Sequence, residues 1–484
     1  MILAIVAYLP SQAAFAHFMT QPYLLPVPFW MYAYACAATL VLTFVVLGYF
    51  SGTNSQVAAA RTWEVPAAIP WSAIGRWTLR LLRVGAVAYL LLTVVTALFG
   101  SMIATENASM MLFWVVFLLG FTYLNALVGD LYQLINPWRT LLEWSEKFGA
   151  DFSKARVAYP EWLGYYPAFV FYVFVIWLEL FSVPNPRSLA WTLIGYTALN
   201  VAAAAAFGKA AWFHFGEMFS VFFRLIGSLA PVEYLPTADR SSWRVRLRAP
   251  FVGALAERPE HIGLVFFVLF MLSSTTYDAI HDTEMWLNFY WKFLIVLAQP
   301  LWGTDMAKAE GPLMMWFLIF KRGGMLLAPF LYFALYMLVM MWTKALTRTT
   351  LSLRTLALEF VTSLIPIAFV YSVSHYYTML LLEGARLPMV LTDPFGFGWN
   401  LFGVEPSKPT YIEMGVVWHT QVGLILAGHV VSVYLAHAAA LRIFPTRREA
   451  IMSQIPMLLL MVAYTAIGLY VLSLPLGLRQ LREG

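Results

Sequence analysis

The sequence predicts an all-α, polytopic membrane protein with ten to twelve transmembrane helices. Hydrophobic residues make up 61% of the 484 residues and charged residues only 11%, whereas soluble domains carry about 25% charged residues. The apolar runs are continuous and about 20 residues long, as a spanning helix requires, whereas barrel strands would be shorter and alternating. Because backbone groups inside lipid must be paired within the protein, this pattern favours helices.

Ten apolar runs have the length of a membrane span. They are expected at about 29–50, 84–103, 110–129, 162–181, 189–207, 262–280, 325–342, 356–380, 414–440 and 455–474. Three further apolar stretches are interrupted, at about 210–230, 285–302 and 313–320, so each is a re-entrant, interfacial or additional spanning helix. No repeat and no long linker is evident, so we expect residues 17–484 to form a single transmembrane domain.

The first 16 residues have features of a short signal peptide. The apolar stretch from Ile2 to Leu9 is followed by the small-residue pattern Ala14-Phe15-Ala16. Cleavage after this pattern would make His17 the first residue of the mature chain. A terminal amine and an imidazole on one residue can bind a metal together, although an ordinary surface histidine is the alternative interpretation.

The loops alternate in charge, which predicts the orientation of the chain. Those after the first, fifth, seventh and ninth spans are basic, and the alternate loops are poor in Lys and Arg. Because basic loops favour the cytoplasmic side, the N-terminus and the acidic loops are expected outside, although Arg479 and Arg482 near the C-terminus go against the rule. The basic residues are Arg61, Arg76, Arg80, Arg83, Arg240, Arg244, Arg246, Arg248, Arg258, Lys344, Arg348, Arg354, Arg442, Arg447 and Arg448.

Charge and cysteine content exclude several classes of protein. The arginines lie in short loops between spans, so the net charge of +5 indicates membrane topology and gives no sign of nucleic-acid binding. The single cysteine, Cys36, lies inside the first apolar run, which excludes disulfide frameworks and cysteine-based zinc sites.

Ionisable side chains are costly inside a bilayer, so those that project toward the outer side are candidates for a functional site. Asp278 ends the sixth span, His375 lies near the outer end of the eighth, and His429 lies in the ninth. Imidazole and carboxylate groups are common ligands of zinc and related metals. We therefore expect Asp278, His375 and His429 to be catalytic and, together with His17, to bind a divalent metal, zinc or copper.

Less specific interpretations apply to the same residues. His281, one helical turn after Asp278, and His419, near the outer start of the ninth span, could be exposed or interfacial. His375 and His429 could each make an interhelical hydrogen bond, as membrane histidines often do.

A second polar group is expected toward the inner side. It comprises Asp130, His214, Glu217 and His437. Glu217 lies in a very apolar stretch and therefore needs a partner, for which Arg139 and Arg224 are the candidates. A structural ion pair is one interpretation of this group, and a path for protons or substrate is the other.

Several stretches form a series over most of the chain. They are Ala16-His17, LPVPFWMYAYACAATLVLTF, INPWR from Ile135, WFHFGEMFSVFF from Trp212, SSTTYDAI, SHYYTMLLLEG, LTDPFGFGWNLFG and AGHVVSVYLAHAAAL. In this order they resemble a bacterial membrane-protein family known as fenitrothion hydrolases. The resemblance implies hydrolysis of a lipophilic organophosphorus triester in the bacterial inner membrane. The site residues that it implies are His17, Glu217, Asp278, His375, Asp393, His429 and His437.

The expected function is thus a membrane-embedded hydrolase of lipophilic esters, with its site near the outer face. A transporter or channel for a small solute or a metal ion is one alternative, although no pairing of interrupted helices between two halves is evident. A non-catalytic subunit of a membrane complex is the other. The expected partners are the lipid bilayer, a lipophilic small molecule and a second membrane subunit.

Overall fold

The computed structural model describes residues 28–50, 63–64, 71–182, 185–236, 243–257, 259–297, 306–404 and 413–473. The predicted signal peptide and His17 therefore lie outside the described residues. Within them, nine helical segments are long and apolar enough to cross a membrane. The prediction of an all-α, polytopic membrane protein is confirmed.

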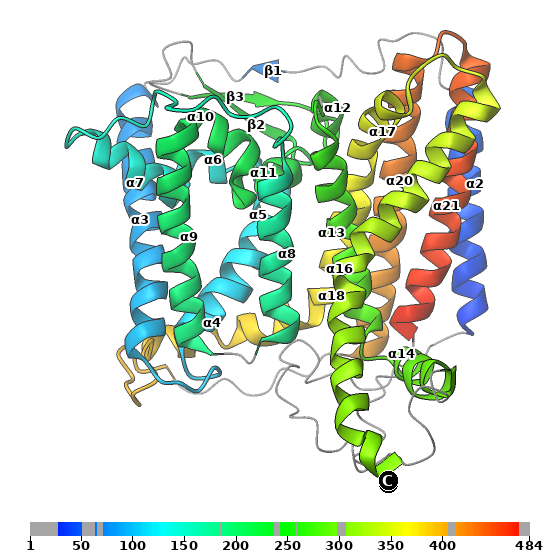
Figure 1. Cartoon of the computed structure of the whole chain (residues 1–484). Helices are drawn as coiled ribbons and strands as arrows, with labels where there is room; N and C mark the ends of the chain where they lie inside the picture. Colours follow the sequence, from blue (N-terminus) through cyan, green and yellow to red (C-terminus); the bar gives the residue numbers. More distant parts are fainter. Residues whose placement is uncertain are drawn as a thin grey trace.

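The helices run up and down through the molecule in one compact bundle (Figure 1). Nine spanning segments are α2 (Phe29–Phe50), α3 (Trp71–Phe99), α4 (Ala108–Met110) with η2 (Met111–Gly120) and α5 (Phe121–Val128), α9 (Pro186–Phe207), α13 (Ile262–Ile280), α16 (Met306–Thr347), α17 (Leu353–Val361) with η5 (Thr362–Leu364) and α18 (Ile365–Ala385), α20 (Met414–Ile443), and α21 (Arg447–Ser473). A tenth helix, α8 (Tyr166–Phe181), is shorter and packs against α13.

Local sequence explains where several helices begin and end. Asn185 caps the start of α9, because its side chain accepts the hydrogen bond of the Arg187 amide at 2.9 Å and Pro186 occupies the first turn. Gly208 ends the same helix with a φ of +79°, a conformation that costs glycine little. The Asn185 side-chain amide, Pro186 and Gly208 thus fix the boundaries of α9 where the apolar pattern alone cannot.

The two ends of the bundle differ in character. At the upper end of Figure 1 lie α6 (Tyr132–Ile135), α7 (Pro137–Glu146), α12 (Gly253–Ala256) and a small antiparallel sheet in the order β1 (Trp63–Glu64), β3 (Trp243–Leu247), β2 (Val232–Pro236). At the lower end lie α14 (Glu284–Asn288) and α19 (Leu387–Thr392). The upper end carries Arg244, Arg246 and Arg248 of a loop predicted to be inner, so on that prediction the upper end faces the cytoplasm.

The three interrupted stretches have different structures. Residues 313–320 are not a separate element, because they belong to α16, a continuous helix of 42 residues. Residues 285–302 include α14 and η4 (Phe289–Leu294), which lie across the lower end of the bundle (Figure 1). Residues 210–230 contain α10 (Lys209–Ala211), η3 (Trp212–Gly216) and α11 (Met218–Gly227), with the helical path broken at Glu217.

The bundle has two groups of helices that meet at α13. One group contains α3, η2, α5, α8, α9 and α11, and the other contains α2, α16, α17, α18, α20 and α21 (Figure 1). Helix α13 packs against α8 on one side and against α16 and α18 on the other, and most of its residues are buried. Its lower end carries Asp278.

Candidate functional site

The Asp278 carboxylate joins two helices at the lower end of α13. Its Oδ2 lies 2.7 Å from Nε2 of His375 on α18. The same oxygen accepts a hydrogen bond from the Tyr376 hydroxyl at 2.9 Å. The Asp278 side chain is only 3% exposed and that of His375 12%. A buried carboxylate with both an imidazole and a phenol on one oxygen is an arrangement suited to proton transfer.

Further acidic and basic groups continue from this pair toward α16. His281 Nδ1 lies 3.9 Å from Asp278 Oδ1 and 2.9 Å from the Asp278 carbonyl oxygen. Its Nε2 lies 3.3 Å from Asp282 Oδ2, and the Lys321 ammonium contacts the other Asp282 oxygen at 2.6 Å. His281 is 3% exposed, so it is buried within the cluster and is not the exposed histidine that was one prediction.

A cavity of about 170 Å³ lies beside Asp278, between the two groups of helices. Residues of η2, α8, α9, α11, α13 and α18 line it, and most of the lining is apolar. Asp278, His281 and Tyr376 form part of its wall, together with Glu179 of α8. The Tyr376 hydroxyl also interacts with Glu179, so this phenol lies between two carboxylates from different helices.

The size of the cavity limits what it can hold. An engineered protein cavity of about 150 Å³ binds benzene, so this one has room for a single substituted ring or a few waters. Typical pockets for drug-sized ligands have about 300–1,000 Å³. Glu383 and Arg386, which form an ion pair at 2.8 Å, also line the cavity. The cavity is therefore small and mostly apolar. Acidic and basic side chains form one part of its wall, and the Glu383–Arg386 ion pair forms another.

His429 lies in another buried group. Its Nδ1 donates to the Ile425 carbonyl oxygen at 2.8 Å, and its ring lies 6.2 Å from that of Tyr371 and 6.4 Å from that of Tyr464. Among the described residues, His429 Nε2 is buried and has no hydrogen-bond partner. None of these described contacts joins His429 to Asp278 or His375.

The metal-ligand set predicted from the sequence is not assembled in the described part of the chain. No group of three or more His, Cys, Asp and Glu side chains there is arranged to hold a metal ion. Asp278 and His375 provide two suitable ligand types, but both nitrogens of the neighbouring His281 already contact protein oxygens. His17 lies outside the described residues, so the zinc or copper ion stays a prediction.

Three other predicted residues have local roles. Asp393 accepts the backbone amides of Phe397 at 3.0 Å and Gly398 at 2.7 Å, which shapes the loop after α19. His437 is buried against Gln454, with 3.2 Å between Nδ1 and Oε1. His419 is exposed and contacts the Tyr32 hydroxyl at 3.2 Å, as the interfacial interpretation predicted.

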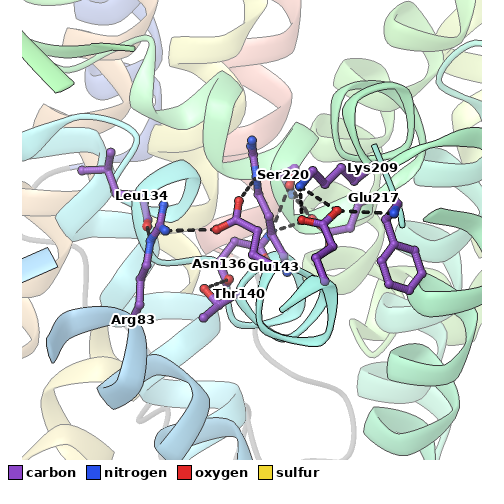
Figure 2. A network of polar contacts seen from close by, with 11 residues as sticks. Arg83, Leu134, Asn136, Thr140, Glu143, Lys209, Glu217 and Ser220 are labelled. Carbon is purple, nitrogen blue, oxygen red and sulfur yellow. Dashed lines mark hydrogen bonds and ion pairs between the residues drawn. The ribbon is translucent and has the colours of Figure 1, made fainter. Parts of the chain in front are cut away.

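Glu217 belongs to a separate polar network, shown in Figure 2. Its carboxylate is fully buried and accepts hydrogen bonds from the Ser220 amide at 2.7 Å and hydroxyl at 2.5 Å, from the Tyr196 hydroxyl, and from Asn136 Nδ2 at 3.4 Å. It also accepts the Phe219 amide at 3.2 Å and so caps the start of α11.

The prediction of an arginine partner for Glu217 is wrong. Arg139 bonds to Glu143 at 3.2 Å, and Arg224 lies 3.8 Å from Glu257. Neutral donors instead satisfy the Glu217 carboxylate. They come from the first turn of α11, where the helix favours a negative charge, and from residues that pack beside that turn. Glu217 therefore stabilises the helix break in residues 210–230.

Sequence reasoning missed Tyr376 and Glu179. Glu179 carries a usable signal, because it is a lone carboxylate in the apolar run YVFVIWLELF. Tyr376 carries none, since one tyrosine among 25 resembles the others in the apolar spans.

No protein-family model matches the chain, and no curated protein and no solved structure matches it.

Proposed function

We propose that this chain is a membrane-embedded hydrolase of lipophilic esters, with organophosphorus triesters as the substrate class, in the bacterial inner membrane. The observation that carries the proposal is the buried Asp278 carboxylate, which contacts His375 and Tyr376 at the wall of an apolar cavity. An uncharged triester partitions into lipid, and a cavity within the helix bundle would take it from there. The resemblance to fenitrothion hydrolases supports the same chemistry.

In this proposal Asp278 acts as the general base, because it lines the cavity where water and substrate would meet. The water oxygen bonds to phosphorus as the proton passes to Asp278, and the bond from phosphorus to the aryl oxygen breaks. His375, 2.7 Å from Asp278, stabilises the carboxylate and holds it in position. Tyr376 donates its hydroxyl hydrogen bond to the same carboxylate and helps to hold it in position, and the departing phenolate takes up the proton from Asp278.

The cavity volume favours a particular binding mode. A chamber of about 170 Å³ accommodates the aromatic leaving group but not a complete dialkyl aryl triester. The dialkyl phosphoryl group would therefore lie between the ring and the Glu383–Arg386 pair. A single ring with a small substituent, such as a nitrophenyl group, is the leaving group that this cavity fits best.

A proton-coupled transporter is the second candidate. The observation that favours it is the run of alternating basic and acidic groups, His375, Asp278, His281, Asp282 and Lys321, from α18 across α13 to α16. Ionisable groups inside membrane proteins often form proton relays, and this run lies where the two groups of helices meet.

The test uses purified protein in detergent and a nitrophenyl dialkyl phosphotriester. We expect nitrophenol release in the wild type, and at least a hundredfold loss in Asp278→Asn and His375→Ala, with only a few-fold change in His419→Ala. His419 is the matched control because it is an exposed histidine of α20. Elution volume in size-exclusion chromatography and the melting temperature show whether each variant is folded.

Two results would contradict the hydrolase proposal. One is nitrophenol release that is unchanged in a folded Asp278→Asn variant, and the other is absence of release in the wild type. Proton-driven solute uptake by proteoliposomes, lost in Asp278→Asn, would then establish the transporter. Absence of both activities, together with co-purification of a second membrane protein, would identify a non-catalytic subunit.

A further inference from the structure

A second, larger cavity lies on the other side of α13. This groove has a volume of about 740 Å³ and is lined by α13, α14, η4 and α16. Its lining is almost wholly apolar, and Leu327 and Leu331 on its α16 wall are 59% and 67% exposed. In a chain that spans a membrane, exposed leucines at this depth face lipid. The groove is therefore open to the bilayer.

The walls of the groove are held together by specific contacts. The Tyr290 hydroxyl donates to the Leu313 carbonyl oxygen at 2.8 Å, which ties η4 to α16. The ring of Trp286 stacks on that of Phe320 at 4.8 Å, and the Tyr277 hydroxyl bonds to the Lys321 carbonyl oxygen. These contacts join the four elements that form the groove, α13, α14, η4 and α16.

Two hydrogen-bond donors on the groove wall have no acceptor. Ser273 Oγ and Trp286 Nε1 are both buried and have no partner among the described residues. Ser273 is 0% exposed. A buried donor without an acceptor costs free energy, so each of these side chains would gain by turning toward acceptor oxygens that a ligand brings into the groove. A ligand that fits the groove therefore has apolar chains and ester or carbonyl oxygens.

Two glycines of α16 shape the groove. A methyl group at Gly323 would meet no atom within 4 Å, so the space beside it is open. A methyl group at Gly324 would lie 2.9 Å from the Tyr277 ring and 3.2 Å from that of Trp286. Gly324 therefore lets these rings close the groove on one side, whereas Gly323 leaves room for a ligand on the other.

The charge around the groove indicates the head group. Lys292 of η4 and Arg322 of α16 are exposed and adjoin lining residues in the sequence. Among the described residues, no ion pair neutralises either of them. Cations beside an apolar groove at one end of a spanning bundle favour an anionic lipid head group.

We propose that the groove is a binding site for an anionic diacyl phospholipid of the surrounding membrane. One acyl chain fills the apolar groove, and the ester carbonyl oxygens accept hydrogen bonds from Ser273 and Trp286. The phosphate lies near Lys292 and Arg322. This site is separate from the Asp278 cavity and does not depend on the hydrolase proposal.

The test measures phospholipid that remains bound to the purified full-length chain. The protein is exchanged into detergent, supplied with phosphatidylglycerol or phosphatidylcholine, and examined by native mass spectrometry. We expect one retained phosphatidylglycerol per chain, at least fivefold less in Ser273→Ala, and almost none in Gly323→Leu. The Lys292→Gln, Arg322→Gln double variant should lose the preference for phosphatidylglycerol over phosphatidylcholine.

A matched control uses Gly195→Leu, because Gly195 is an exposed glycine of α9 whose added methyl group would also meet nothing within 4 Å. It should retain lipid like the wild type. Equal retention in Gly323→Leu and wild type would overturn the proposal. So would displacement of the lipid by an equimolar phosphotriester, because the groove would then be a substrate site. Nitrophenol release by each variant is measured in parallel, so failure of the hydrolase proposal is seen separately.

Discussion

The Asp278 carboxylate and the His375 imidazole are 97 residues apart in the chain and 2.7 Å apart in space. Each comes from a different helix, and the pair fixes the lower end of α13 relative to the middle of α18. Because both side chains are nearly buried, this contact contributes to stability as well as to the proposed chemistry.

His375→Ala should lower stability measurably even if catalysis is ignored. Removing the imidazole leaves a buried carboxylate with fewer partners, which costs about 1–3 kcal/mol. His375→Gln keeps a donor near Asp278 and should lose less. Melting temperature in detergent measures the difference. If His375→Ala melts like the wild type, the pair does not join α13 and α18 as described.

The Glu217 network predicts a large effect on stability that does not involve the proposed catalytic residues. Glu217→Ala removes the acceptor of several buried donors at once and should destabilise the chain by about 2–4 kcal/mol. Glu143→Ala is the matched control, because Glu143 is 27% exposed and its ion pairs should contribute about 0–1 kcal/mol. Thermal unfolding of the two variants compares them directly, and a smaller effect of Glu217→Ala than of Glu143→Ala would contradict this account.

The Tyr371 side chain of α18 reaches α21 at Gly468, where there is no side chain to block it. A methyl group there would lie 1.5 Å from the Tyr371 hydroxyl oxygen, a distance that the packed helices cannot accept. Gly468→Ala should therefore greatly reduce the yield of folded protein, because small residues let helices approach closely in membranes. Adding Tyr371→Ala should restore much of that yield, as judged by size-exclusion chromatography. An unaffected Gly468→Ala single variant would show that this packing is wrong.

The predicted metal can be tested by chelation. If zinc or copper takes part, exhaustive dialysis against a chelator should abolish nitrophenol release, and one equivalent of the correct ion should restore it. Metal content by mass spectrometry should fall in parallel in His17→Ala and His375→Ala. Full activity in protein shown to be free of metal would disprove the metal prediction but would leave the Asp278 mechanism intact.

Much of the fold follows directly from hydrophobicity. The predicted span at 262–280 coincides with α13, because polar residues at His261 and His281 bound an uninterrupted apolar run. The continuous α16 was predicted as two pieces, since Lys321 and Arg322 interrupt its apolar pattern. The helix continues through them because Asp282 neutralises Lys321, a contact that comes from another part of the chain.

The candidate site was predictable only in part. A costly carboxylate and imidazole at similar depth indicated Asp278 and His375, and the structure brings the two together. His429 faces Tyr371 and Tyr464 instead. Which neighbour a side chain meets depends on the rotation of each helix about its axis. Helices that are apolar on all sides, such as α18 and α20, carry no amphipathic pattern that reveals this rotation.

The short helix α8 has a consequence for the membrane itself. Its 16 residues extend only about 24 Å at 1.5 Å per residue, less than the roughly 30 Å thickness of the hydrocarbon layer. Val170 and Phe174 expose 60% and 45% of their surface along this helix, and thinning of the lipid beside it would relieve the hydrophobic mismatch. Since α8 also carries Glu179 at the wall of the Asp278 cavity, thinner lipid there would shorten the distance that a charged product travels from the cavity to water.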